Sequence, residues 1–457
     1  MDRRSFLHGT SGSLFGLSLR SLITGLPTAF LMSPRAMAQS APAARYVLLA
    51  HSQGGESVNA SGPGSFAREH FSHANASHYG ESVVCNGVTY TADDLTATMD
   101  YVPNPQGGGP LKIARCFGAF GNLIDSTAFF HYRTTTGIHP QFPVVRQLHG
   151  RCLDNVTGRG VEDYGSALAQ EIHPLTGSIL AKPILLARAG GNYQGQPLIR
   201  YRPTELASLI RSSVQQEVPP EKFAAARNFV VDSYNRRLRR EGTPQQKRYF
   251  DNHVKSQLDA QLVGERLGGV IDSINGDSML SQMNLAALLF KLNITSVVKC
   301  DHVFSGDNHQ PDGLTTEAEL TLNMMKNYCE FFNRAEELEI LEQVLYATFS
   351  VFGRGMNVTN NGRGHNSNLC TGMLVGKGFI KKQQIGGIDP ENKKGHNLPF
   401  DANTKLPVAA DQTGSSIVPV NDSIVSYCKS VMRAAGVPQD RVDARFKGNV
   451  PTVDLLA

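Results

Sequence analysis

Several polar residues in the second half of this 457-residue sequence have the types and spacing of a metal site. Residues 306–309 read Gly-Asp-Asn-His, and residues 362–366, beyond a helical pattern and an apolar run, read Gly-Arg-Gly-His-Asn. Carboxylate and imidazole groups are ligands that suit zinc and similar ions. Asp307, His309 and His365 therefore indicate the metal-assisted chemistry of a hydrolase, although Asp307 could equally serve the turn in which it lies.

A second set of candidates follows the first apolar strand pattern and the apolar run near residue 350. Glu56 and Ser57 come directly after a glycine pair at 54–55, the kind of loop in which α/β proteins place ligands. Glu56 is a candidate fourth ligand, and Ser57 is a candidate nucleophile or an ordinary loop serine. Arg354 could hold an anionic small molecule through its planar fork or brace a loop carboxylate. Ser52 lacks a Gly-x-Ser-x-Gly elbow, so a serine-hydrolase triad is poorly supported.

The N-terminus has the three-part layout of an export signal. An arginine pair at positions 3 and 4 precedes an uncharged stretch rich in glycine, serine and leucine, and residues 36–38 (Ala-Met-Ala) form a small-x-small cleavage pattern. Paired arginines are typical of the twin-arginine route. We expect a signal peptide over residues 1–38, recognition by the twin-arginine translocase, and a bacterial protein that is periplasmic or secreted. A membrane anchor is the alternative, but Arg20 and Pro27 interrupt the stretch that a spanning helix needs.

Charge and cysteine content narrow the classes of partner. Removing residues 1–38 takes away four arginines and one aspartate, so the formal net charge of +4 falls by three, to +1. A nearly neutral chain argues against nucleic acid or an anionic membrane as a partner. The seven cysteines include no CxxC spacing, which argues against a zinc knuckle or a thioredoxin motif and leaves their pairing open.

Strand and helix patterns alternate along the chain and must position the candidate residues. Short buried strands are expected over Tyr46–Ala50, Thr127–Phe130, Ile184–Ala187, Ile294–Val298, Gln343–Ser350 and Gly372–Val375. Helices are expected over residues 220–290 and 316–342, an irregular insertion over residues 60–110, and loops over residues 357–368 and 381–394. This alternation predicts an α/β fold with a largely parallel central sheet and helices on both faces, in one domain spanning residues 39–457.

The ordered motifs resemble the domain-of-unknown-function 1501 family, whose members are often twin-arginine exported and which is assigned to the alkaline phosphatase/sulfatase superfamily. The family pattern has a strand ending in Gly-Gly-Asn-Asp, a Trp-Asp-Thr-His stretch, a strand ending in Ser-Glu-Phe-Gly-Arg, a Gly-Thr-Asp-His-Gly loop and a glycine-rich strand and turn. This chain matches it in order at Asp307, His309, residues 352–354 (Phe-Gly-Arg), His365 and residues 372–378. The resemblance is strongest over residues 294–390 and implies an alkaline phosphatase/sulfatase-like fold.

Two carboxylates of the family pattern are replaced in this chain. Val351 stands where the family has Glu before Phe-Gly-Arg, and Gly364 stands where it has Asp before His. In the superfamily, such carboxylates bind one or two divalent ions that hold the phosphate or sulfate and lower the pKa of the attacking group. The four remaining candidate ligands would hold one divalent ion such as zinc, manganese or calcium.

Two functions of different classes follow from the resemblance and its departures. The replaced carboxylates favour an exported cell-envelope protein that acts as a binding or assembly module, with an incomplete metal site and weak or no catalysis. The alternative is a metal-dependent phosphate or sulfate ester hydrolase, in which water or Ser57 attacks and Arg354 holds the anion. The resemblance also implies a companion exported protein as a partner.

Overall fold

The computed structural model describes residues 45–52, 82–104, 109–134, 137, 162–188, 190–208, 270–301, 313–359, 362–389, 395–446 and 448–457. The chain groups into two compact units, one made of Met1–Gln39 and Arg202–Asp277 and the other of Ser40–Tyr201 and Ser278–Ala457. Of the first unit the structure describes a short helix over residues 203–208 and a helical turn over residues 270–272. The second unit contains the central sheet.

The central sheet is mixed and has seven strands in the order β15-β6-β14-β11-β1-β10-β7. Its strands are β1 (Tyr46–Ser52), β6 (Thr127–Tyr132), β7 (Ile184–Leu185), β10 (Val297–Asp301), β11 (Val344–Ser350), β14 (Cys370–Val375) and β15 (Gln383–Ile385). β14 is antiparallel to both of its neighbours, and every other pairing in the sheet is parallel. All strands except β14 therefore end at the same edge, which we call the carboxyl edge.

β1 and β11 form the centre of the sheet, and all seven residues of each strand are buried. Strands that are covered on both faces read as continuous apolar runs, which is why Tyr46–Ala50 could be recognised in the sequence. Leu49 of β1 is paired with Lys299 of β10 on one side and with Ala347 of β11 on the other. Successive side chains alternate between the two faces, so each face needs its own cover of helices.

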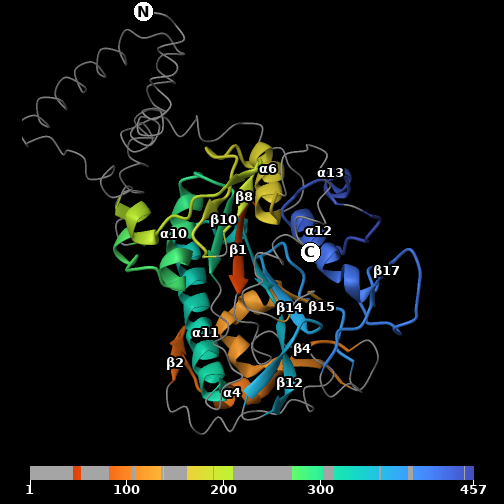
Figure 1. The fold of residues 1–457 in the computed structure, drawn as a ribbon. Helices are drawn as coiled ribbons and strands as arrows, with labels where there is room; N and C mark the ends of the chain where they lie inside the picture. Colours follow the sequence, from red (N-terminus) through yellow and green to blue (C-terminus); the bar gives the residue numbers. More distant parts are fainter. Residues whose placement is uncertain are drawn as a thin grey trace, which may run out of the picture. The chain divides into compact units, whose positions relative to one another are not determined.

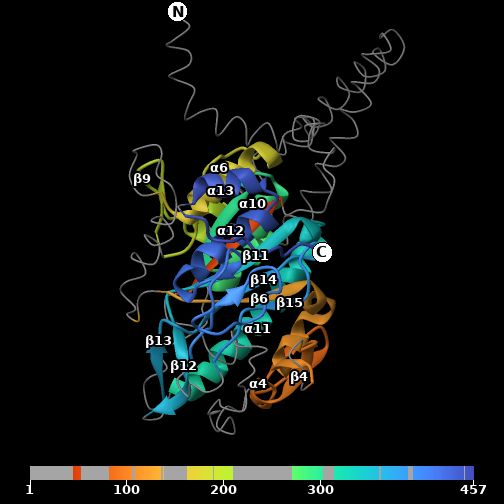
Figure 2. The same ribbon diagram turned by 90° about the vertical axis from the view of Figure 1, so that its right-hand side faces the viewer.

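Helices cover both faces of the sheet (Figures 1 and 2). They are α6 (Tyr164–Thr176), α10 (Met279–Lys291), α11 (Gly313–Glu337), α12 (Ser423–Ala434) and α13 (Gln439–Arg445). On the face of α10 and α11, Tyr46 stacks on Phe290 with ring centroids 5.1 Å apart. On the face of α6 and α12, the Phe349 ring lies 5.5 Å from Tyr164 and 4.9 Å from Tyr427. This arrangement confirms the predicted α/β class.

Ladder pairing between β11 and β14 stops after Ala347 and Leu374. Beyond that pair, the Tyr427 hydroxyl of α12 donates to the Thr348 carbonyl at 2.8 Å and replaces a backbone donor. The Tyr427 ring needs the space beside Gly372, where an added Cβ would lie 2.3 Å from a ring carbon. A helix on the surface of the sheet thus completes the hydrogen bonding of its central strand.

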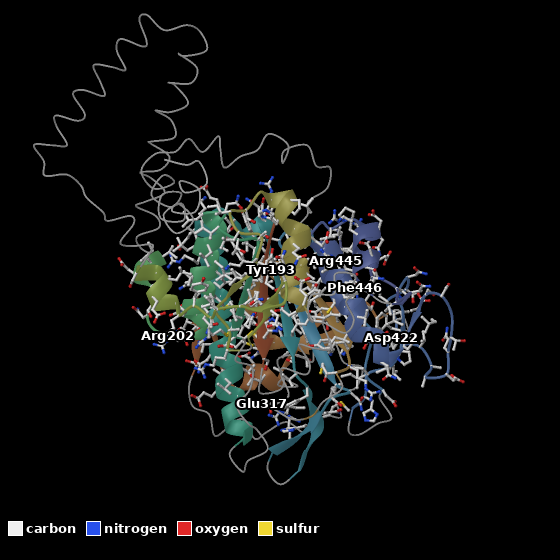
Figure 3. The ribbon with its side chains drawn as sticks, turned by 45° about the horizontal axis from the view of Figure 1, so that its top comes forward. Tyr193, Arg202, Glu317, Asp422, Arg445 and Phe446 are labelled. Atoms are coloured by element: carbon white, nitrogen blue, oxygen red, sulfur yellow. The ribbon has the colours of Figure 1, made fainter. Side chains whose placement is uncertain are left out.

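Ion pairs tie α6 to the sheet and to the C-terminal helices. Nζ of Lys299 on β10 lies 3.2 Å from Oδ1 of Asp163, and both side chains are almost fully buried. Asp163 also caps α6 by accepting a backbone N–H of its first turn. Farther along the helix, Glu171 accepts hydrogen bonds from Arg441 and Arg445 at 2.6 Å each (Arg445 is labelled in Figure 3).

The predicted strands are confirmed as β1, β6, β7, β10, β11 and β14, although β10 starts and ends three residues later than expected. The helix expected over residues 316–342 is α11, which ends at Glu337. Of the helical region expected over residues 220–290, the structure describes residues 270–290, most of which belong to α10. The C-terminal helices α12 and α13 carry no feature that the sequence motifs had singled out.

Two segments that the sequence presents as loops are ordered in strands. Residues 357–359 belong to β12 (Gly353–Thr359) and residues 362–366 form β13 (Gly362–Asn366), which together make a hairpin. Residues 381–394 include β15, which is buried. The hairpin was missed because glycine and asparagine are frequent in it, and its buried side chains include two arginines beside Met356. β15 was missed because Lys381 and Lys382 directly precede it and gave the segment the character of an exposed loop. Burial begins at the next residue, Gln383.

The insertion expected to be irregular contains short elements in its described part. Residues 82–114 form β2 (Val83–Cys85), β3 (Val88–Tyr90), α4 (Asp93–Thr96), β4 (Thr98–Val102) and β5 (Leu111–Ala114). The 3-10 helix η5 (Arg115–Ser126) follows and packs against α11. The remaining elements are β8 (Asn192–Tyr193), β9 (Gln196–Pro197), η7 (Leu341–Gln343), β16 (Phe400–Asp401), β17 (Ile417–Val418) and η8 (Val420–Asp422). Among the helices in the described ranges, none has the length and hydropathy of a membrane span.

Candidate functional site

The candidate site lies at the carboxyl edge of the sheet, where open α/β sheets bind ligands. Two of the six predicted site residues, Arg354 and His365, are described, and both lie on the β12–β13 hairpin that follows β11. The other four, Glu56, Ser57, Asp307 and His309, lie outside the described residues. The geometry of the site is therefore built from the hairpin and from the strand ends of the sheet.

The hairpin brings Arg354 and His365 together. They are cross-strand partners in the β12–β13 ladder, and both contact the ring of Phe352. The His365 ring stacks on Phe352 at 4.3 Å between centroids, and the Arg354 guanidinium lies 5.2 Å from the same centroid. Arg354 is fully buried, and its Nη1 donates to the Arg363 carbonyl at 3.3 Å. Within the described residues Arg354 therefore links the two strands of the hairpin through a backbone carbonyl.

A second buried arginine fixes the hairpin to α11. Nε of Arg363 lies 3.0 Å from Oε2 of Glu317, and both side chains are at most 1 % exposed. Arg363 also donates to the Met356 carbonyl across the hairpin. A charge-assisted pair of this kind is strong in a dry environment, and losing one partner leaves a buried charge behind. The buried Glu317–Arg363 pair thus links the hairpin to α11.

His365 is exposed and is held in one orientation. Its Nδ1 donates to the carbonyl of Gly137, and in the neutral ring this leaves the lone pair on Nε2. Metal-binding histidines are oriented in this way, with one nitrogen bonded to a carbonyl and the other directed at the ion. His365 therefore fits the role of a metal ligand, and its predicted co-ligands lie outside the described residues.

The two positions at which the resembled family has carboxylates differ in their surroundings. Val351 is fully buried and packs with Leu185, Ala187 and Phe352 in an apolar group that we call the strand-end cluster. Gly364 is exposed, and a Cβ added to it would meet no atom within 4 Å. Gly364 and His365 together form what we call the hairpin rim. The strand-end cluster has no space or solvent for a carboxylate, whereas the rim has both.

Two serines at the carboxyl edge were not among the predicted site residues. Ser52 and Ser350 are paired neighbours at the ends of β1 and β11, and both are buried. Neither hydroxyl has a hydrogen-bond partner in the part of the chain that the structure describes. Buried polar atoms are normally satisfied, so these two hydroxyls are candidates for contact with a ligand or water at the carboxyl edge. The signal that could have identified them is a serine at the last position of each central strand.

A buried histidine lies two strands away from β11. His131 of β6 is paired with Thr371 of β14, whose Oγ1 lies 3.4 Å from its Nδ1. Burial lowers the pKa of His131 to about 4, while the Asn397 side chain acts in the opposite direction. The imidazole is therefore neutral at pH 7 and could accept a proton only at a high energetic cost.

Asp301 supplies a carboxylate at the end of β10, beside His51 of β1 in the sheet register. The Arg188 amide donates to its Oδ1 at 2.9 Å, and Nε2 of Gln282 donates to its Oδ2 at 3.2 Å. Burial raises the pKa of Asp301 above its ordinary value, against the lowering effect of these hydrogen bonds. Within the described ranges, no three His, Cys, Asp or Glu side chains converge closely enough to hold a metal ion.

No protein-family model matches the chain, and no curated protein sequence matches it significantly. The family resemblance therefore rests on the motifs of the sequence itself. The structure shows a mixed sheet of the α/β class and, in the residues that it describes, carries no feature specific to that family.

Proposed function

We propose that this chain is an exported bacterial cell-envelope protein that serves as a binding or assembly module with weak or no catalysis. In this proposal the scaffold is of the alkaline phosphatase/sulfatase type and its metal site is incomplete. The carboxyl edge of the sheet is the binding surface, and the β12–β13 hairpin is a rigid part of its rim.

The observation that carries the proposal is the enclosure of Arg354. A phosphate or sulfate hydrolase needs a cation directed at the anionic group of its substrate. Arg354 is instead fully buried, bonded to the Arg363 carbonyl and placed against Phe352. Its guanidinium stabilises the hairpin, which supports a structural role for a residue that the hydrolase hypothesis needs for substrate.

The packing of Val351 supports the same conclusion. A carboxylate at the end of β11 would supply negative charge for a divalent ion. The side chain found there belongs to the apolar strand-end cluster with Leu185 and Ala187. A site that lacks this charge holds fewer ions or holds them more weakly, which favours binding over turnover.

The hydrolase remains the second candidate because His365 is oriented as a metal ligand. Its Nδ1 is bonded to the Gly137 carbonyl and its ring stacks on Phe352, so Nε2 is presented from an exposed position. If Asp307 and His309 approach it, the three side chains would make a site for one zinc-like ion with an open position. The two candidates therefore differ in metal content.

Metal analysis of protein purified without a histidine tag separates the two functions. We expect less than about one-tenth of a zinc, manganese or calcium ion per chain, and no turnover across phosphate and sulfate ester panels. About one tightly bound ion per chain, with turnover lost on chelation and restored by the metal, would replace the module with the hydrolase. H365A is the matched variant, because it should abolish any stoichiometric metal and leave Arg354 in place.

Export is tested separately from activity. Replacing the arginine pair in the variant R3K/R4K should leave the precursor in the cytoplasm, because the twin-arginine route recognises that pair. Fractionation of a bacterial host, with R20K as the control, gives the readout. Export of R3K/R4K at the normal rate would exclude the twin-arginine route.

A further inference from the structure

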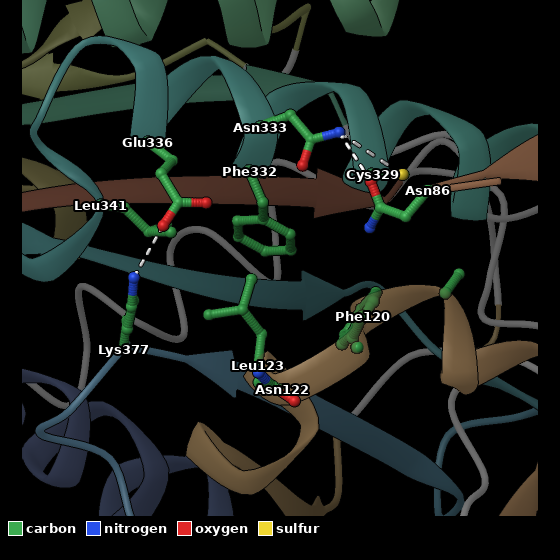
Figure 4. A pocket seen from close by; sticks show the side chains of 12 residues that line it. Asn86, Phe120, Asn122, Leu123, Cys329, Phe332, Asn333, Glu336, Leu341 and Lys377 are labelled. Atoms are coloured by element: carbon green, nitrogen blue, oxygen red, sulfur yellow. Dashed lines mark hydrogen bonds and ion pairs between the residues drawn. The ribbon is translucent and has the colours of Figure 1, made fainter.

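A cavity of about 330 Å3 lies at the edge of the sheet opposite the candidate site (Figure 4). Its lining includes Leu341, which precedes the start of β11, and Lys377, which follows the end of the antiparallel strand β14. Both positions are at the amino ends of the parallel strands. The cavity is therefore separate from the carboxyl edge, and a ligand bound in it would be independent of the proposed function.

The middle of the cavity is apolar. Phe120 of η5 and Phe332 of α11 meet edge to face with centroids 5.6 Å apart, and each is 4 % exposed. Leu123 and Leu341 extend this surface. A volume of this size lies at the low end of small-molecule sites, roughly 300 to 1,000 Å3, so it suits one small molecule with an apolar body.

One end of the cavity presents both signs of charge. Nζ of Lys377 lies 2.8 Å from Oε1 of Glu336, and the two side chains are 38 % and 62 % exposed. Glu336 raises the pKa of Lys377 above its ordinary value, so the ammonium is charged at neutral pH. An exposed ion pair contributes little to stability, so its members can part to accept a carboxylate and an ammonium from a ligand.

The other end of the cavity presents amides. Nδ2 of Asn333 donates to Oδ1 of Asn86 at 2.9 Å, as the dashed line in Figure 4 shows. Each amide has a second polar group, which leaves the Asn333 oxygen and the Asn86 nitrogen to bond a ligand. The side chain of Asn122, which also lines the cavity, makes no hydrogen bond to any residue in the described ranges.

We propose that this cavity binds a free aromatic α-amino acid with a polar tip, of the tyrosine type. The α-carboxylate bonds Lys377 and the α-ammonium bonds Glu336. The ring lies against Phe120 and Phe332, and the hydroxyl at its tip bonds the Asn86–Asn333 pair. The charged groups, the ring and the hydroxyl of the ligand thus meet the charged, apolar and amide surfaces in the order in which they occur along the cavity.

Isothermal titration calorimetry of the full mature chain with three probes tests each part of this match. L-Tyrosine should bind with one site per chain. Tyramine, which lacks the carboxylate, and 3-(4-hydroxyphenyl)propionate, which lacks the ammonium, should each bind about tenfold more weakly or worse, because each loses one charge-assisted hydrogen bond. L-Phenylalanine should bind more weakly than L-tyrosine, because it leaves the amide pair without its hydroxyl partner.

Two variants and a matched control place the binding in the cavity. K377M and E336Q should each weaken L-tyrosine binding about tenfold or more. K382M removes an exposed lysine paired with Asp125 at 2.9 Å, outside the cavity lining, and should bind L-tyrosine normally. Thermal melting should show that all three variants are folded. The proposal is overturned if L-tyrosine does not bind at millimolar concentration, if the zwitterion shows no advantage, or if K377M and E336Q bind as K382M does.

Discussion

Val351 and Gly364 occupy the two positions at which the family that this sequence resembles has carboxylates. The two positions differ in their exposure to solvent. Val351 is fully buried and packs against the other apolar side chains of the strand-end cluster. Gly364 lies on the hairpin rim, exposed and with open space around its α-carbon. Residue 351 is therefore enclosed by apolar side chains, whereas residue 364 borders open space. A carboxylate introduced at position 351 should be the more destabilising of the two.

Restoring the carboxylate at the buried position should have the largest effect. V351E is expected to lower the free energy of unfolding by about 5 kcal/mol at pH 7, because the apolar cluster offers a charge neither solvent nor a partner. Urea denaturation measures it, with V351Q as the neutral control. The excess loss of V351E over V351Q should shrink as the pH falls toward 4, where the unfolded glutamate also binds a proton. A V351E protein as stable as the wild type would place residue 351 against solvent or a cation.

The ion pair beneath the hairpin comes next. R363M should cost about 4 kcal/mol, because Glu317 would remain buried without the guanidinium that compensates its charge. The double variant E317Q/R363M should recover at least half of that loss, since it also removes the stranded charge. Chemical denaturation of the two variants and the wild type measures both changes in the free energy of unfolding. A loss of less than about 1 kcal/mol for R363M would mean that water reaches the pair.

Acid should weaken the packed region through His131. The pKa of its imidazole is about 4 in the folded protein, against about 6.5 in the unfolded chain. Because the unfolded state binds this proton first, the contribution of the neutral ring is complete above about pH 6.5 and is lost as the pH falls to about 4. The total is about 3 kcal/mol.

Urea midpoints between pH 7 and pH 4 measure this acid sensitivity. H131Q should have a shallower slope than the wild type, and H365Q, altered at the exposed rim, should keep the normal slope. Equal slopes for H131Q and the wild type would assign the acid sensitivity to other groups.

Glycine substitutions compare the two regions at the level of one methyl group. G353A should cost about 2 kcal/mol, because its Cβ would lie 1.4 Å from the Leu369 carbonyl oxygen and the backbone would have to shift. G364A, its counterpart on the rim, should change stability by less than about 0.5 kcal/mol. Thermal or urea unfolding of G353A and G364A measures both changes in the free energy of unfolding. Equal losses would remove the distinction between a packed and an open position.

The smallest effect is expected for the carboxylate restored on the rim. G364D should change the free energy of unfolding by less than about 0.5 kcal/mol, since the side chain would enter solvent beside the exposed His365. The measurement is the same urea titration as for V351E. A large loss for G364D would show that the rim is covered in the folded protein.

The central sheet could be predicted because its signal is local. Tyr46–Ala50 and Gln343–Ser350 are unbroken runs of residues that suit strands buried on two faces, and both became central strands. The direction of β14 could not be predicted, because Gly372–Val375 has the same apolar pattern in either orientation. The hairpin could not be predicted either, because its buried groups include Arg354 and Arg363, which a local pattern places on a surface.

Of the candidate site, the sequence could propose residue types suited to metal and anion binding, but it could not predict which of them are buried. The sequence proposed Arg354 for substrate binding but could not show that it is buried beside the Phe352 ring and the Arg363 carbonyl. The Glu317–Arg363 pair joins residues 46 positions apart, which no motif connects. Ser52 and Ser350 are distant in the chain and become neighbours only through the register of β1 and β11.

The β11–β14 ladder stops after Ala347 and Leu374, and side chains from other elements bond the backbone of β11 beyond that point. This arrangement has a consequence for the order of folding. The Ser350 amide donates to the Tyr132 hydroxyl, and the Thr348 carbonyl accepts from Tyr427 on α12. During synthesis the Thr348 carbonyl therefore lacks its native donor until the helix that carries Tyr427 has been made. A nascent chain stopped before α12 would expose an unfinished strand edge, which is a target for chaperones and for aggregation.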